Sequence, residues 1–251
     1  MGDLQRDPRE DIRSYGRRHG RKFSARQERL LTERLPRLAI DLASPPPADS
    51  TDLFSCPVRE VWLEIGFGGG EHLLWQAERS PDVGLIGCEP YLDGVVKVLD
   101  AVETRQLRNV RILADDARPL LRWLPQASIG RVFILFPDPW PKSRHHKRRL
   151  VSAAFLRSLA RVMKPGAELR IATDIGDYAR TSLLAVRATP FFRWLAESPS
   201  DWRERTLDWP PTRYEQKAVA AGRRPAYLRF LRTDELAVAL NRTELPQAIA
   251  R

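Results

Sequence analysis

The chain has 251 residues, 43% hydrophobic and 29% charged, a composition that supports a sizeable core and excludes disorder of the whole chain. It has no run of about 18 apolar residues and no apolar signal-peptide core at its start, which predicts a soluble cytoplasmic protein without membrane contact. The formal charge of +10 predicts a polyanionic partner, nucleic acid first, although a GC-rich genome would give the same excess of arginine.

Residues 1–57 are predicted to form a basic arm and linker. A helix is expected within 25–42, where Pro36 would break the helix or begin another. The cations before and within its start are Arg13, Arg17, Arg18, Arg21, Lys22, Arg26 and Arg29. The proline-rich stretch 44–51 is typical of a linker. We expect the arm to wrap RNA, and the alternative is a solvated helix face.

From residue 58 the pattern changes to short apolar runs that alternate with segments of helical periodicity. This alternation predicts successive βαβ units and a doubly wound α/β domain over 58–233. The expected strands are 58–65, 84–89, 110–114, 129–135 and 168–173, and the expected helices are 71–78, 92–105, 118–124, 151–163 and 177–187. Pro165 and Gly166 are predicted to stop the fourth of these helices after Lys164.

The last part of the chain carries one apolar and aromatic run, 226–231. Methyltransferase-like sheets commonly finish with an antiparallel strand, and this run is the candidate. The tail, 234–251, has weak helical character and no recognisable chemistry.

A glycine-rich turn follows the first predicted strand, Leu63-Glu64-Ile65-Gly66-Phe67-Gly68-Gly69-Gly70. Open α/β sheets bind ligands at this edge, and Gly66 and Gly68 let the backbone approach a ligand closely. A dinucleotide fingerprint needs a third glycine where Glu71 stands, so a carboxylate would meet the pyrophosphate. The pattern instead suits S-adenosylmethionine, whose cationic end Glu64 could face.

Two further acids follow the next two predicted strands. Glu89 is the expected ligand of the ribose hydroxyls. Asp116 opens a helix, where it would contact the adenine amino group or act only as a helix cap. The two cysteines, Cys56 and Cys88, lack disulfide-scaffold or zinc spacing, so we expect packed thiols and no metal site.

The fourth predicted strand runs into Pro137-Asp138-Pro139-Trp140-Pro141-Lys142. Amino-methyltransferases of adenine or cytosine use a related loop to hold the amine, and packing alone is the other explanation of such a proline-rich turn. The loop leads directly into the densest cationic block of the chain, Arg144, His145, His146, Lys147, Arg148 and Arg149, which favours a functional loop.

With these motifs in place, nearly the whole chain resembles the bacterial tRNA (guanine-N7-)-methyltransferases. The resemblance rests on Arg13-Ser14-Tyr15 with 17–21, on the glycine turn, on 136–142 with 144–149, on Ala172-Thr173-Asp174 and on Thr212-Arg213-Tyr214-Glu215. It implies a Rossmann-like class I methyltransferase with a seven-stranded, mostly parallel sheet, acting with S-adenosylmethionine on guanine N7 at position 46 of the tRNA variable loop.

The resemblance also implies residue roles. Glu64, Gly66, Gly68, Glu89, Asp116 and Asp138 would hold the cofactor, with Asp138 also catalytic. The substrate would contact Lys142, Asp174, Thr212, Arg213, Tyr214 and Glu215, and the RNA would contact the block from Arg144 to Arg149. The family usually has T-K-F-E where this chain has Thr212 to Glu215, and arginine is no simple replacement for lysine.

Guanine N7 carries an in-plane lone pair, so its methylation needs no proton removal. We therefore expect Asp138 to act by orientation and electrostatics. We expect no obligate protein partner, and we assign His145 and His146 to RNA contact or loop surface. Two alternatives stay open: a methyltransferase acting on DNA or protein, and an RNA-binding protein without catalysis.

Overall fold

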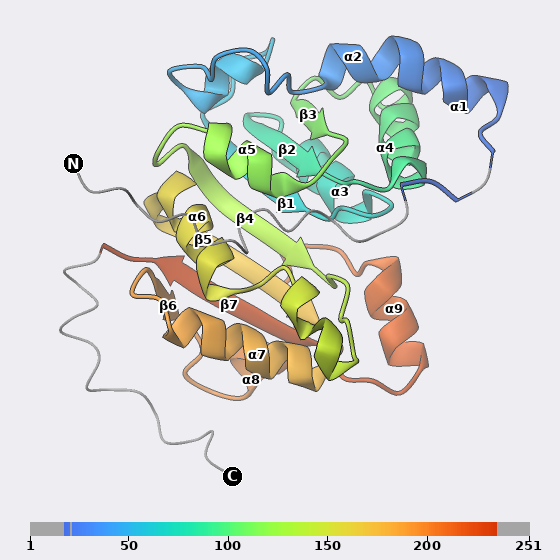
Figure 1. Cartoon of the computed structure of the whole chain (residues 1–251). Coiled ribbons are helices and arrows are strands. Elements are labelled where there is room, and N and C mark those ends of the chain that lie inside the picture. Colours follow the sequence, from blue (N-terminus) through green and yellow to red (C-terminus); the bar gives the residue numbers. More distant parts are fainter. Residues whose placement is uncertain (1–17, 21, 235–251) are drawn as a thin grey trace.

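A computed structural model describes residues 18–20 and 22–234. Its centre is one seven-stranded sheet in the order β3-β2-β1-β4-β5-β7-β6 (Figure 1). The strands are β1 Glu60–Ile65, β2 Val83–Cys88, β3 Val110–Leu113, β4 Ile129–Leu135, β5 Met163–Thr173, β6 Phe192–Trp194 and β7 Ala226–Arg232. Neighbours from β3 to β5 pair in parallel, whereas β7 is antiparallel to β5 and to β6. The predicted sheet with its antiparallel carboxyl-terminal strand is confirmed.

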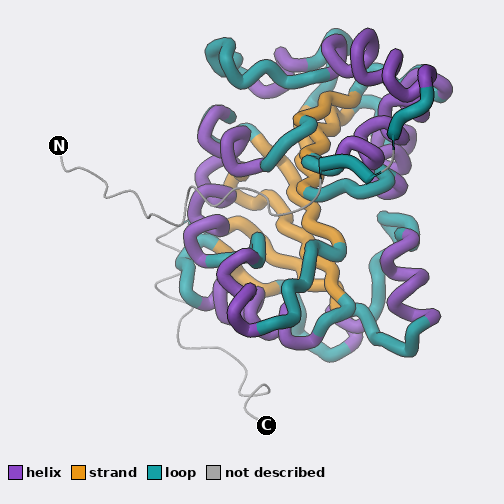
Figure 2. The backbone as a smooth tube through the Cα atoms, turned by 45° about the vertical axis from the view of Figure 1, so that its right-hand side comes forward, coloured by secondary structure: helices purple, strands orange, loops and turns teal. Residues whose placement is uncertain are grey.

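Helices cover both faces of this sheet (Figure 2). They are α1 Ala25–Arg29, α2 Leu35–Leu38, α3 Glu71–Arg79, α4 Leu92–Thr104, α5 Ala117–Trp123, α6 Ala153–Val162, α7 Gly176–Arg187, α8 Ser200–Arg203 and α9 Arg213–Ala220. Short 3-10 helices, η3 Ser50–Leu53 and η4 Ser143–Arg148, and the π-helix η2 Leu30–Arg34 complete the set. No helix in the described ranges is long and apolar enough to cross a membrane.

Side chains alternate between two hydrophobic clusters along each strand. In β1, Leu63 joins the cluster shared with α5, α6 and α7, and Trp62 joins the cluster shared with α3 and α4. A strand buried on both faces needs this apolar run, because neither set of side chains meets water. The strand order reverses between β1 and β4, so the carboxyl ends of these two strands border the crevice where such sheets bind ligands.

The described part of the predicted arm packs against the same sheet. Leu30 and Leu38 are buried in the second cluster, and Ile40 donates its backbone N–H to the carbonyl of Ile112 in β3 at 3.0 Å. Pro36 does not end the helix, because a π-turn precedes it and the N–H of Leu35 reaches the carbonyl of Leu30. Arg13, Ser14, Tyr15, Arg17, Arg21 and the tail from 235 lie outside the described residues.

The predicted stop after Lys164 is wrong. Helix α6 ends at Val162 and β5 begins at Met163, so Pro165 and Gly166 lie in the strand. They occupy an irregularity in the β4–β5 pairing, where Gly166 takes a φ of +79°. A bulge tolerates proline because the extra residues leave the hydrogen-bonded ladder.

Candidate active site

The turn between β1 and α3 is built from glycines in left-handed conformations. Gly66 and Gly68 have φ values of +77° and +56°. Gly70 has a φ of +80° and caps α3, and a Cβ there would lie 2.2 Å from Cγ2 of Val98. The backbone therefore turns sharply from strand to helix with Phe67 as its one side chain, and a Cβ at Gly66 would meet open space.

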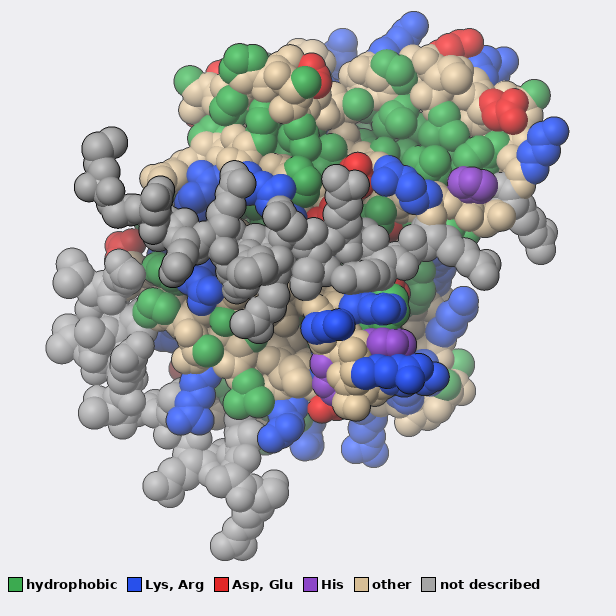
Figure 3. Space-filling model, viewed as in Figure 1, with side chains coloured by type: hydrophobic (Ala, Val, Ile, Leu, Met, Phe, Trp, Pro, Cys, Tyr) green, Lys and Arg blue, Asp and Glu red, His purple; other side chains and the backbone are tan. Residues whose placement is uncertain are grey.

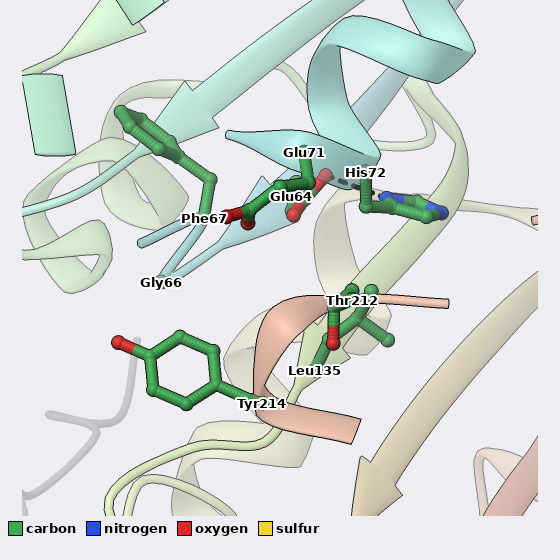
Figure 4. A pocket seen from close by; sticks show the side chains of 8 residues that line it. All are labelled: Glu64, Gly66, Phe67, Glu71, His72, Leu135, Thr212 and Tyr214. Carbon is green, nitrogen blue, oxygen red and sulfur yellow. Dashed lines mark hydrogen bonds and ion pairs between the residues drawn. The ribbon is translucent and has the colours of Figure 1, made fainter. Parts of the chain in front are cut away.

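Glu64 lies at the edge of this space with its carboxylate almost fully buried. Its Oε2 is 2.7 Å from Nδ1 of His72, as the dashed line in Figure 4 marks. Gln76 Nε2 donates to the backbone carbonyl of Asp208 at 3.0 Å and lies 3.1 Å from His72 Nε2. A carbonyl only accepts, so this Gln76 atom is the amide nitrogen, His72 Nε2 is the acceptor and His72 Nδ1 donates to Glu64.

Glu89 is also buried, and both of its carboxylate oxygens accept backbone hydrogen bonds. Gly68 N–H donates at 2.8 Å and Tyr91 N–H donates at 2.9 Å. Burial raises the pKa of Glu89, the two amides oppose this shift, and the charges of Asp138 and Glu64 add to it. Glu64 and Asp138 are thus near enough to Glu89 for their charges to raise its pKa.

Asp116 takes the helix-capping position that the sequence allowed. Its side chain accepts from Arg118 N–H at 2.9 Å and lies 3.3 Å from Arg118 Nε. The capping interpretation is confirmed, and contact with adenine stays a prediction.

The loop after β4 bends at two non-glycine residues with left-handed backbones. Phe136 has a φ of +52° and Trp140 a φ of +43°. Such conformations cost about 1 kcal/mol or more each and gather at functional sites. Asp138 lies between these two bends and is exposed beyond the carboxyl end of β4.

The cationic block forms η4 and the residues beside it. Its exposed members are Lys142, Arg144 and Lys147, with His145, His146 and Arg148 partly exposed. The Arg148 guanidinium lies 4.9 Å from the centre of the Trp140 ring, and His145 meets the same ring edge-on. Figure 3 shows Lys, Arg and His side chains gathered on this part of the surface. Partial desolvation, and then Arg148 and Arg144, lower the pKa of His145.

Arg149 differs from the rest of the block because its side chain is only 4% exposed. It donates to the Pro139 carbonyl at 3.0 Å, to Thr181 Oγ1 at 2.9 Å and to Asp177 Oδ2 at 2.7 Å. These contacts tie the loop after β4 to α7. The guanidinium of Arg149 therefore faces the protein, and the expected RNA contact of this residue gains no support from the structure.

The predicted substrate segment, Thr212 to Glu215, starts α9. Thr212 caps the helix by accepting from Glu215 N–H at 3.3 Å, and Tyr214 lies against Gly68. Arg213 Nε is 3.4 Å from Glu71 Oε1. Thr212 and Tyr214 therefore face the glycine turn and line one pocket with Glu64, Gly66, Phe67, Glu71, His72 and Leu135 (Figure 4).

Two predicted substrate residues are held by other side chains of the protein. Glu215 is buried and accepts from Arg205 Nε at 3.0 Å. Asp174 accepts from Arg223 Nε at 2.6 Å, which links the end of β5 to the chain after α9. The structure brings these residues to the same edge, with their carboxylates already paired.

Sequence reasoning missed His72, Gln76, Asp208 and Arg170. The only signal was the spacing of four between His72 and Gln76, which puts them on one helix face behind Glu64. In the ranges that the structure describes, no three His, Cys, Asp or Glu side chains are grouped to hold a metal ion.

Comparisons with known proteins identify the family of the chain. A family model described as a putative methyltransferase matches residues 58–227. A tRNA (guanine-N(7)-)-methyltransferase from Chelativorans sp. is 50% identical over 218 residues, which cover 87% of this chain and 94% of that protein. One from Rhodospirillum rubrum is 49% identical over 228 residues, covering 90% and 89%.

Among solved structures, the 16S rRNA methyltransferase KamB is similar, with a TM-score of 0.50 over 70% of this chain and 89% of that one. Its sequence identity is 16%, so this likeness bears on the fold alone. The relatives at about half identity confirm the resemblance that the motifs gave. The chain belongs to the tRNA (guanine-N(7)-)-methyltransferase family.

Proposed function

We propose that this chain transfers a methyl group from S-adenosylmethionine to N7 of guanine 46 in the variable loop of tRNA. The observation that carries the proposal is the placement of the buried carboxylates of Glu64 and Glu89 at the glycine turn after β1, with Asp138 on the loop that leads into the basic helix η4. The acids suit a cationic donor and a product base that becomes cationic. The printed names of the relatives support the same substrate class.

The pocket chemistry fits S-adenosylmethionine, which supplies an activated methyl group on a sulfonium centre. The described lining residues include the carboxylates Glu64 and Glu71 and no Lys or Arg. Glu64 uses Oε2 for His72, and in the described residues its Oε1 has no hydrogen-bond partner. Glu64 would therefore accept from the ammonium end, while Glu89 would accept from the ribose hydroxyls with its remaining lone pairs.

Asp138 would orient the guanine and oppose its developing charge. Guanine N7 attacks with its own lone pair, so no base has to remove a proton. Methylation makes the ring cationic, and a fixed carboxylate nearby stabilises that charge more as the reaction proceeds. Asp174 is paired with Arg223, so it is the weaker candidate for this electrostatic role.

The basic surface would hold the tRNA by its phosphates. Lys142, Arg144 and Lys147 are exposed beside the loop that carries Asp138, so they could grip the backbone next to an extruded base. The cytoplasmic location and the RNA-wrapping role of the arm stay predictions within this proposal.

The test is transfer of labelled methyl from S-adenosylmethionine to an unmodified tRNA transcript, followed by digestion and mass spectrometry of the nucleosides. The expected result is 7-methylguanosine in the variable-loop fragment, and none with a transcript in which guanine 46 is replaced by adenine. Methylation of duplex DNA or protein instead would favour a different methyltransferase. tRNA binding without any transfer would favour the non-catalytic alternative.

A further inference from the structure

The hydrogen-bond chain that begins at Glu64 does not end in the cofactor pocket. It continues through His72 and Gln76 to the backbone carbonyl of Asp208, a residue 132 positions after Gln76. Glu64, His72 and Gln76 are exposed by 3% or less. Each polar atom in the chain has one role, since the Asp208 carbonyl fixes the Gln76 amide and the amide fixes the donor atom of His72.

The same stretch is anchored from the sheet. Arg170, which is 2% exposed, donates to both carboxylate oxygens of Asp208, with Nη1 to Oδ1 at 2.9 Å. Burial alone would raise the pKa of Asp208, but the hydrogen bonds from Arg170 and Thr206 hold it well below its usual value. The neighbouring Trp209 packs edge-on against His72 at 5.8 Å between ring centres. Asp208 and Trp209 therefore anchor the loop between α8 and α9.

Asp208 lies four residues before Thr212, the residue that caps α9. Thr212 and Tyr214 line the pocket opposite Glu64, and Tyr214 lies against Gly68 (Figure 4). A displacement of His72 or Gln76 would therefore move the chain that carries one wall of the pocket. One end of the hydrogen-bond chain is the predicted cofactor carboxylate, and the other end, the Asp208 carbonyl, lies four residues before the predicted substrate segment that starts at Thr212.

We propose that His72 and Gln76 are positioning residues that couple occupancy of the pocket at Glu64 to the placement of residues 208–215. The inference rests on the proposed function, because it takes the cofactor and the tRNA as the two ligands. When the cofactor fixes Glu64, the chain holds Asp208 and the start of α9 in the arrangement that tRNA binds. By linkage, tRNA raises the affinity for the cofactor by the same factor.

The test is calorimetric titration of S-adenosylhomocysteine into the full-length protein, with and without a saturating unmodified tRNA transcript. The ratio of the two dissociation constants is the coupling factor, and we expect about fivefold or more for the unsubstituted protein. Gln76→Met keeps the volume and removes both donated hydrogen bonds. We expect its coupling factor to fall to within about twofold of one.

Two further variants separate positioning from loss of structure. Glu78 lies on α3 with Gln76 and forms an exposed ion pair with Arg105, which follows α4. Glu78→Gln removes this pair, and its coupling factor is expected to match that of the unsubstituted protein. His72→Phe keeps a ring against Phe133 and is expected to lose the coupling. His72→Asn keeps a side-chain donor near Glu64, so we expect it to bind S-adenosylhomocysteine more tightly than His72→Phe but to show no coupling.

A folded Gln76→Met protein that binds both ligands with an unchanged coupling factor would overturn the inference alone. A coupling factor of one in the unsubstituted protein would do the same. Failure of the unsubstituted protein to bind S-adenosylhomocysteine or tRNA would overturn the proposed function, and the inference with it.

Discussion

Glu64, Glu89 and Asp138 are held in three different ways at one edge of the sheet. Glu64 is fixed by His72, Glu89 by two backbone amides, and Asp138 by a bent loop that leaves it exposed. A buried carboxylate needs such donors to stay ionised, whereas an exposed one is solvated. This division suits fixed cofactor ligands on the inside and a group that meets the incoming base on the outside.

We predict that Asp138→Asn lowers kcat about 100-fold or more at saturating cofactor and tRNA, because the amide keeps the shape and loses the charge. Methyl incorporation at saturation measures this effect. Asp82→Asn, which removes an exposed pairing with Arg59 at the start of β2, is the matched control and is expected to keep kcat within about twofold. Near-normal turnover of Asp138→Asn would remove the electrostatic role.

Glu89 gives a prediction with a defined sign. Because burial raises its pKa, the folded protein binds a proton here more tightly than the unfolded chain does. This contribution to stability is present below the ordinary carboxyl pKa and is lost as the pH rises through the raised value. The difference in Tm between the unsubstituted protein and Glu89→Gln should therefore shift in favour of the unsubstituted protein as the pH falls from neutral towards the ordinary carboxyl pKa.

As the pH is lowered in the same way, the affinity for S-adenosylhomocysteine should fall, since ribose binding uses the ionised form of Glu89. Titration calorimetry at each pH checks this fall, and differential scanning calorimetry checks the Tm. A Tm difference that does not change with pH would contradict the assignment of the raised pKa.

At the scale of elements, apolar runs predicted the buried strands well. Strand β4 matches its predicted range, 129–135, and four other parallel strands were found with shifted ends. A continuous apolar run indicates burial on both faces of a strand, which is how these strands lie in the sheet. Strand β6, at the sheet edge, has three residues and only Phe192 buried, so it gave no such signal.

The site was predicted less evenly than the fold. Motifs located Glu64, Glu89 and Asp138, because each lies at or just after the carboxyl end of a strand. They could not separate Arg149 from Arg148, since both read as members of one cationic run. Which of two adjacent arginines turns inward depends on Asp177 and Thr181 of α7, which are distant in sequence.

This difference between neighbours gives a paired prediction for the loop after β4. Arg149→Met removes three hydrogen bonds of a buried guanidinium and should lower the free energy of unfolding by about 1–3 kcal/mol. Arg148→Ala should leave the Tm nearly unchanged, weaken tRNA binding and reduce its salt slope by about one. Denaturant unfolding and filter binding over a salt series distinguish the two. Equal effects of both substitutions on the salt slope would contradict the inward assignment of Arg149.

At the scale of the whole molecule, the positions of the cations indicate more about RNA binding than the net charge of +10 does. The exposed cations of η4 lie beside the loop that carries Asp138, whereas other exposed cations lie toward the opposite edge, where β3 and β5 begin. A coding bias toward arginine would spread charge over the surface without regard to the site. Affinity for a polyanion that depended on net charge alone would respond equally to losses at either edge.

Two variants of equal charge separate these explanations. The first replaces Lys142, Arg144, Lys147 and Arg148 with Gln, and the second replaces Arg108, Arg122, Arg157 and Lys164, so each lowers the formal charge from +10 to +6. If each site cation neutralises one phosphate, the first should flatten the plot of log Kd against log salt by about three. The second should leave that slope within about one of the original, because its cations meet no phosphate. Binding isotherms at four salt concentrations measure both slopes. Equal flattening by the two variants would show that the basic surface attracts RNA through net charge alone.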